Sequence, residues 1–171
     1  MDDREPAKEA EPAMSYTLTL NDQLTLSWPS GFHVMNEEER GKLSFYGDGP
    51  CEAIADLDRH IVVSIGWKPL GRFFGMLLGT KDIARDMEKK LSQPMRSYGW
   101  RAGSVLTKAV DGEKAEGYSY EYEAQGIGMY GESYALKHGK TVYYLHFYAR
   151  KAQKDESLEA LDTILASAKW R

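Results

Sequence analysis

Histidine and cysteine are the side chains that most often carry acid–base, nucleophilic or metal chemistry, and this sequence contains few of them. Its histidines are His33, His60, His138 and His146, and no two of them have the spacing of a metal-binding pair. His146 lies in an apolar, strand-like segment, which favours a hydrogen-bonded core histidine over a metal ligand or a proton carrier. Cys51 is the only cysteine and has no basic neighbour in the sequence, so we interpret it as a small apolar side chain.

Acidic residues gather in one part of the chain, at Asp48, Glu52, Asp56 and Asp58. Clusters of carboxylate oxygens can bind a hard cation such as Ca²⁺. The order of these acids and the positions of the nearby glycines do not match an EF-hand loop. We therefore favour a solvated acidic loop and keep a cation site as the alternative.

The glycine pattern Gly126-x-Gly128-x-x-Gly131 has the letters of a dinucleotide-binding fingerprint. That fingerprint requires a helix N-terminus to receive the phosphate, whereas this segment leads into a strand-like stretch. The chain also lacks the G-x-S-x-G motif of a hydrolase nucleophile elbow. The sequence predicts no cofactor and no catalytic residue.

Most of the chain's 11 tyrosines lie in three consecutive strand-like stretches near its C-terminal end. Alternation places Tyr118, Tyr120 and Tyr122 on one face of their strand, and we expect Tyr130 and Tyr134 to extend that face across a hairpin. The favoured interpretation is aromatic pairing beneath a helix. The alternative is a partly open aromatic floor that contacts a ligand or a peptide.

A glycine-punctuated apolar segment, KPLGRFFGMLLG at residues 68–79, precedes the first long helical pattern. We favour a crossover packed over one end of a sheet; the alternative is an apolar loop that contacts a ligand, a partner or a membrane surface. Combined with the tyrosines, the segment defines a possible interaction surface. Its residues are Leu70, Phe73, Phe74, Met76, Leu77, Tyr118, Tyr120 and Tyr122.

Length and composition indicate one domain, which we place at residues 15–171, after an acidic, Ala/Pro-rich tail at residues 1–14 that we expect to be disordered. The net charge of −4 and the lack of a Lys/Arg-rich block argue against a nucleic-acid partner. No apolar run is long enough to predict a transmembrane helix. The first residues do not resemble a signal peptide, which predicts a cytoplasmic protein; an extracytoplasmic one is the alternative if an export signal has been removed.

Hydrophobic periodicity predicts about eight strands, two substantial helices and one short helical turn. The strands are expected at residues 15–20, 24–28, 43–46, 60–67, 100–110, 118–123, 130–136 and 141–149, and the helices at residues 36–40, 80–94 and 154–168. Most strands are joined by turn signals such as Asp111-Gly112, so we expect an α+β fold. Its centre would be an antiparallel sheet of about six to eight strands, flanked by helices and covered on both faces.

Several short phrases in this order of elements resemble the PsbP-like superfamily, which includes the photosystem extrinsic protein PsbP, the Ran-GTPase release factor and bacterial DcrB-type lipoproteins. They are W-P-x-G-F at 28–32, Gly117-Tyr118, G-E-x-Y at 131–134, K-x-G-K at 137–140 and S-x-x-W at 167–170. The resemblance implies an α/β/α sandwich around an antiparallel sheet. It also implies a binding or assembly protein, and it transfers no catalytic residue.

The leading hypothesis from the sequence is a non-enzymatic binding or assembly module whose partner is a protein or a small ligand. The alternative is a carrier of a small molecule or a metal ion, using the tyrosine face with His146 or with the acids at 48–58. Hydrolytic activity is a third hypothesis, which no motif supports.

Overall fold

A computed structural model describes residues 14–43, 49–71 and 78–171 of the chain. The strands are β1 (Met14–Leu20), β2 (Leu24–Pro29), β3 (His33–Val34), β4 (Cys51–Asp56), β5 (Ile61–Pro69), β6 (Arg101–Val110), β7 (Glu113–Ala124), β8 (Ile127–His138), β9 (Thr141–Arg150) and β10 (Lys169–Trp170). The helices are α1 (Glu37–Gly41), α2 (Thr80–Met95) and α3 (Lys154–Ala166), with the 3₁₀ turns η1 (Arg96–Tyr98) and η2 (Lys151–Gln153). No helix in these described ranges is long and apolar enough to cross a membrane.

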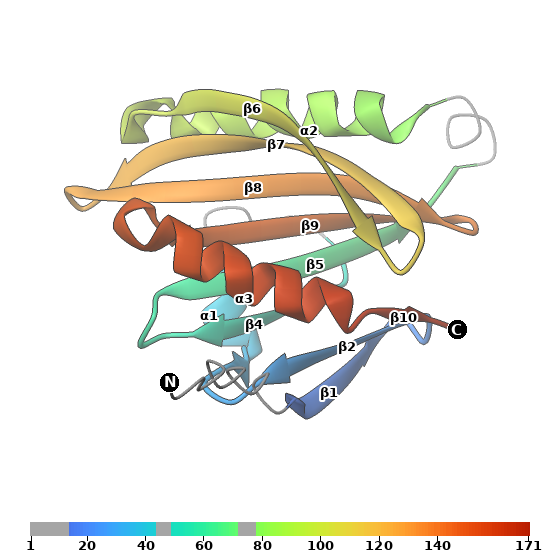
Figure 1. Ribbon diagram of the computed structural model, residues 1–171. Helices are drawn as coiled ribbons and strands as arrows, with labels where there is room; N and C mark the ends of the chain where they lie inside the picture. Colours follow the sequence, from blue (N-terminus) through green and yellow to red (C-terminus); the bar gives the residue numbers. More distant parts are fainter. Residues whose placement is uncertain (1–13, 44–48, 72–77) are drawn as a thin grey trace, which may run out of the picture.

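The described strands form two antiparallel sheets (Figure 1). The larger is seven-stranded, with the order β3-β4-β5-β9-β8-β7-β6, and the smaller is three-stranded, with the order β1-β2-β10. The structure confirms the predicted α+β fold with a central antiparallel sheet. The large residues on both faces of the 141–149 segment predict a central strand. The structure confirms this, because β9 pairs with β5 on one side and with β8 on the other.

Short turns with left-handed backbone build the long hairpins of the central sheet. Asp111-Gly112 joins β6 to β7, and Gln125-Gly126 joins β7 to β8, with positive φ at all four residues. This geometry gives a two-residue turn the twist that antiparallel strands require. The hairpin predicted at Asp111-Gly112 is therefore confirmed.

The central sheet has a different cover on each face (Figure 1). One face packs against the small sheet and α3, in a buried cluster that includes Phe147 of β9, Leu24 of β2 and Leu161 of α3. The opposite face packs against α2, where Leu91 clusters with Tyr120 of β7. Alternation along each strand sends successive side chains to these two cores, so β9 carries large residues on both faces.

The register between β7 and β8 corrects the expected arrangement of the tyrosines. Tyr118 pairs with Ser133, and Tyr134 pairs with Gly117. Residues directly opposite in an antiparallel pair share a face, so Tyr134 and its neighbour Tyr130 lie on the α3 side of the sheet and not with Tyr118. The two-residue turn already implied this pairing, because it makes Ala124 face Ile127.

Glu132 is a buried carboxylate on the α3 side of β8, with only 3% of its surface exposed. The hydroxyl of Tyr130 donates to one carboxylate oxygen at 2.7 Å, and the hydroxyl of Tyr134 donates to the other at 2.6 Å. Both donors lie two residues away on the same strand, where the pleat brings them to the same face. The tyrosines on this side therefore satisfy a buried acid and do not form a surface.

The start of α2 differs from the sequence prediction by one residue. Thr80 begins the helical pattern and has a side chain suited to capping, so the sequence predicts it as the N-cap. The N-cap residue is Gly79, which has no side chain to accept a hydrogen bond. Thr80 instead donates its hydroxyl to Glu116 of β7 at 2.7 Å. The threonine thus fastens the first turn of α2 to the sheet below it.

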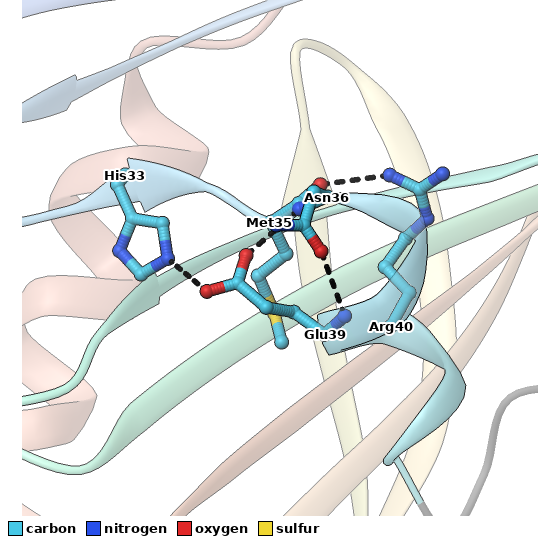
Figure 2. Close-up of polar contacts among 5 residues, drawn as sticks. All are labelled: His33, Met35, Asn36, Glu39 and Arg40. Carbon is cyan, nitrogen blue, oxygen red and sulfur yellow. Dashed lines mark hydrogen bonds and ion pairs between the residues drawn. The ribbon is translucent and has the colours of Figure 1, made fainter.

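The sequence predicts Asn36 as the cap of a short helical turn, and the structure shows that α1 begins there with a capping box (Figure 2). The Asn36 side chain accepts from the Glu39 backbone N–H at 2.9 Å, and Glu39 accepts from the Asn36 N–H at 2.8 Å and contacts His33 Nε2 at 3.0 Å. The Asn36 N–H, followed by the His33 contact, lowers the pKa of Glu39. Arg40 donates to the carbonyl of Met35 at 2.8 Å, which ties the helix to the residue that follows β3.

The region between α1 and β5 contains a strand that the sequence analysis missed. β4 (Cys51–Asp56) pairs with β5 along its whole length, whereas the strand predicted at 43–46 falls almost entirely outside the described residues. Met35 and Leu43, on either side of α1, pack over Ala53 and Ala55 of β4. Residues 35–43, called the α1 segment below, therefore cover the β4 edge of the same sheet face that carries α2.

The sequence predicts that Trp170 folds back onto the domain as an anchor, and the C-terminal residues are held in this way. α3 ends at Ala166, two residues before the predicted end, and the Ser167 hydroxyl donates to the Ser27 carbonyl at 3.0 Å. Trp170 donates its indole N–H to the Val110 carbonyl at 2.8 Å and stacks on His138 with 4.0 Å between ring centroids. These contacts attach the residues after α3 to β2, to the end of β6 and to the end of β8.

Candidate functional site

A cleft lies on the central sheet between α2 and the α1 segment. α2 contacts β7 and β8, the α1 segment covers β4, and the strands between them, β5 and β9, form the floor. An inner lobe of about 240 Å³ opens beside α2, and an outer lobe of about 610 Å³ continues it toward the end of β5. The two lobes share Lys68, Ile83, Asp86 and Tyr144. The cover that we predicted for both faces of β5 and β9 is therefore incomplete on this side.

Small side chains make the floor of the inner lobe low. Cys51 of β4 is paired with Gly66 of β5, and Ser64 of β5 is paired with His146 of β9. A Cβ atom added to Gly66 would lie 3.6 Å from its nearest neighbours, which is ordinary van der Waals contact. The fold does not require a glycine there for space, and its missing side chain leaves the lobe open.

Tyr144 and His146 project from β9 toward the cleft, because they alternate with the buried residues of the opposite face. His146 Nδ1 lies 2.8 Å from the Ser133 hydroxyl oxygen, which in turn lies 3.3 Å from the Tyr120 hydroxyl. Burial lowers the pKa of His146 to about 4, so the ring is neutral at pH 7. A neutral imidazole gives the inner lobe a polar contact without a charge.

The wall on the α2 side combines apolar and charged residues. Ile83 and Met87 face the cleft one turn apart, and Asp86 and Lys90 form an ion pair with 2.7 Å between Oδ2 and Nζ. The hydrogen bond from Asp86, and then its charge, raise the pKa of Lys90. This carboxylate and this ammonium therefore neutralise each other at the rim of the cleft.

Lys68 lies at the junction of the two lobes. Its Nζ is 5.3 Å from the centroid of the Tyr144 ring, which is the distance of a cation–π contact. Among the described residues, no carboxylate forms an ion pair with it, in contrast to Lys90. Among the described residues that line the inner lobe, Lys68 is therefore the ammonium group without an ion-paired carboxylate. Asp82, which lines the outer lobe, lies 3.9 Å from Arg85.

The predicted interaction surface is only partly represented in this cleft. Leu70 is half-buried and lines the outer lobe, together with the neighbouring Leu78. Phe73, Phe74, Met76 and Leu77 lie outside the described residues.

The tyrosines of β7 do not form an open aromatic floor. Tyr118 and Tyr120 are 5% and 0% exposed beneath α2, and Trp100 stacks on Tyr120 with 4.4 Å between centroids. Tyr122 is half-buried at the margin of the same cluster, and burial raises its pKa to about 12. The structure therefore matches the favoured interpretation, aromatic pairing beneath a helix.

The acidic residues singled out in the sequence do not converge. Asp48 lies outside the described residues, and Asp58 is exposed. Glu52 contacts Arg40 at 3.5 Å, and Asp56 accepts from the Arg59 guanidinium at 2.6 Å. Burial opposes ionisation of Asp56, but the Arg59 hydrogen bonds outweigh it and lower the pKa of Asp56. Within the described ranges, no three His, Cys, Asp or Glu side chains are grouped to hold a metal ion.

The residues that sequence reasoning missed are Gly66, Lys68, Met87 and Tyr144. They come from β5, α2 and β9, and no local motif marks any of them. The one signal available was the run of small residues at Ser64 and Gly66 within an otherwise β-branched strand. In a strand with both faces buried, small residues at alternate positions indicate that one face lacks the side-chain volume needed to fill the space above it.

No protein-family model matches the chain in sequence, and none of the curated proteins does. Solved structures do match it in three dimensions. The cyanobacterial PsbP (CyanoP) of Synechocystis sp. PCC 6803 superimposes with a TM-score of 0.62 at 12% identity, covering 98% of each chain. The chain has the PsbP-like fold.

Two further proteins share the PsbP-like fold with this chain. LpqN of Mycobacterium tuberculosis, described as involved in cell envelope biogenesis, has a TM-score of 0.55 at 12% identity, covering 86% of this chain and 82% of its own. The Ran-binding protein Mog1p of Saccharomyces cerevisiae has a TM-score of 0.51 at 9% identity, covering 92% and 96%. At these identities the likeness shows the PsbP-like fold and assigns no role to any residue.

Proposed function

We propose that this protein is a non-enzymatic binding or assembly domain, and that the two-lobed cleft between α1 and α2 is its binding site. The observation that carries the proposal is the uncovered floor of β5 and β9, where Gly66 leaves space that the fold could fill. A concave site with apolar walls and a few polar groups is the usual form of a small-ligand or peptide site.

The relatives in fold support a binding role. Mog1p is a Ran-binding protein, and LpqN takes part in cell envelope biogenesis. Binding another protein is therefore a function that this fold performs in at least one of these proteins.

The contacts of His146 support binding rather than catalysis. The hydroxyl that meets its Nδ1 belongs to Ser133, which is 0% exposed and so cannot attack a substrate. The serine instead connects His146 to Tyr120 beneath α2. This arrangement orients the imidazole and gives the cleft a fixed polar contact.

A pair of matched glycine substitutions tests the proposal. Gly66→Leu fills the inner lobe, and Gly128→Leu places the same side chain on β8 outside the cleft, where a Cβ would likewise meet its neighbours no closer than 3.7 Å. Both variants are expected to melt close to the wild-type protein.

Immobilised wild-type protein and both variants are incubated with a cell extract, and retained proteins and small molecules are identified by mass spectrometry. We expect at least one component to be retained by the wild-type protein and by Gly128→Leu but lost from Gly66→Leu. If nothing that the wild-type protein retains depends on residue 66, the cleft is not its binding site.

A further inference from the structure

Resting on the proposed function, we infer that the inner lobe binds a small molecule with a flat apolar body and a single carboxylate, and that Lys68 receives the carboxylate. Three properties of the lobe lead to this ligand class: its charge, its neutral interior and its shape.

Among the described residues that line it, the inner lobe has one more basic side chain than acidic side chains. Lys68, Lys90 and Asp86 are the charged side chains among the described residues that line it. Asp86 and Lys90 neutralise each other at 2.7 Å, which leaves the ammonium of Lys68. Its contact with the Tyr144 ring holds the lysine over the floor without cancelling its charge.

On the floor of the lobe, the described side chains are uncharged. His146 is neutral, and it is fixed by Ser133 on one side and faces Ser64 on the other strand. The remaining lining is apolar or small, including Met87, Ile83 and Gly66. An ion buried here would lose its hydration without a counter-ion, so the ligand's charge must stay at the rim near Lys68.

The shape of the lobe favours a planar body. The part of the floor formed by Cys51, Ser64 and Gly66 carries only small side chains, and α2 forms a wall on one side. A ring system can lie on such a floor with its edge against His146 and its carboxylate toward Lys68. A cationic ligand would be repelled by the ammonium group of Lys68.

The test uses three probes with one naphthalene body: 2-naphthoate, its neutral amide 2-naphthamide, and the cation 2-naphthylmethylammonium. Binding to the full chain is measured by titration calorimetry at low and high salt. We expect 2-naphthoate to bind about fivefold tighter than the amide, the size of one partly exposed ion pair, and the cation to bind weakest. High salt should reduce the preference for the anion.

Two lysine substitutions locate the effect. Lys68→Gln should remove the preference for the acid and leave the affinity for the amide unchanged. Lys89→Gln makes the same charge change on an exposed position of α2 that does not line the cleft, and it should alter neither affinity. Gly66→Leu should weaken binding of the acid and of the amide alike.

The outcomes separate this inference from the proposed function. Equal binding of acid and amide, tighter binding of the cation, or equal effects of Lys68→Gln and Lys89→Gln would overturn the carboxylate assignment while the cleft stays a binding site. If none of the probes binds, the inference is wrong. The proposed function then stands or falls with the extract experiment and its dependence on residue 66.

Discussion

The hydroxyl of Ser133 lies 2.8 Å from Nδ1 of His146, and this contact joins the cleft to the core beneath α2. Ser133 is fully buried on β8, and His146 stands beside it on β9 at the paired position of the ladder. The same hydroxyl lies 3.3 Å from the Tyr120 hydroxyl. The imidazole of His146, which lines the cleft, is thus oriented by Ser133, a residue that is fully buried.

Replacing Ser133 with alanine should therefore destabilise the protein and loosen the cleft. Loss of the hydroxyl leaves His146 and Tyr120 each without one partner, which costs about 1–3 kcal/mol of the free energy of unfolding. Urea denaturation measures the change. Ser64 lies on the opposite side of His146 and makes no side-chain hydrogen bond within the described part of the chain, so Ser64→Ala should change the free energy of unfolding by less than about 0.5 kcal/mol. Equal losses for the two variants would contradict the role assigned to Ser133.

His146 should make stability depend on pH between about 6.5 and about 4. Its pKa is about 4 in the folded protein and near 6.5 in the unfolded chain, so the unfolded chain binds the proton more tightly. The stabilisation is complete above pH 6.5, falls as the pH drops through this window, and totals up to about 3 kcal/mol. Urea denaturation from pH 7.5 to pH 4 should show this slope.

His146→Gln should flatten that pH dependence, whereas His60→Asn should keep it. His60 is an exposed turn residue with positive φ, a conformation that asparagine tolerates. Asp56, whose pKa is lowered by Arg59 despite burial, loses its stabilisation at lower pH than this window. A wild-type slope that survives in His146→Gln would place the titrating group elsewhere.

Gly131→Ala should destabilise the protein strongly, because β8 passes under the ring of Tyr120. A Cβ at Gly131 would lie 2.3 Å from that ring, and the ring is 0% exposed and cannot move aside. Overpacking of this kind costs about 1–3 kcal/mol. Gly128→Ala on the same strand meets Lys151 at 3.7 Å and should have a free energy of unfolding within about 0.5 kcal/mol of wild type. The comparison, made by thermal and urea unfolding, fails if both variants behave alike.

Trp170→Ala should show that the last residues are part of the fold. The substitution removes the indole hydrogen bond to Val110 and the stacking on His138, and with partial burial we expect a loss of about 1–3 kcal/mol in the free energy of unfolding. Tyr98→Ala, an exposed aromatic on η1, is the matched control and should cost less than about 0.5 kcal/mol. A Trp170→Ala variant as stable as this control would mean that the C-terminal anchor is dispensable.

Local signals were sufficient for the elements of the fold that depend on neighbouring residues. Asp111-Gly112 marks its hairpin because few other pairs accept positive φ twice, and Asn36 marks the start of α1 because its side chain accepts from Glu39. β4 was missed because Asp48, Glu52, Asp56 and Asp58 suggested a solvated loop. Pairing with β5 and contacts with Arg40 and Arg59 keep that acidic segment in the sheet.

The predicted tyrosine face illustrates a limit of periodicity. Alternation correctly places Tyr118 and Tyr120 on the same face of β7. It does not determine which residues of β8 lie on that face of the sheet. The pairing of β7 with β8 decides that Ser133 and Gly131 lie beside these tyrosines and that Tyr134 lies on the other side. The face that carries Tyr118 and Tyr120 is not open to solvent, because α2 packs over it.

The sequence by itself determined the α+β class, the antiparallel hairpins and the amphipathic helices, since each follows from periodicity and turn chemistry over a few residues. The cleft was decided only by the tertiary structure. The cleft is lined by residues of four separate elements, namely Cys51, Gly66, Met87 and His146. They line the same cleft because α2 and the α1 segment pack on separate parts of one sheet face. Long-range packing sets the separation between α2 and the α1 segment on the sheet, and no local sequence signal encodes that separation.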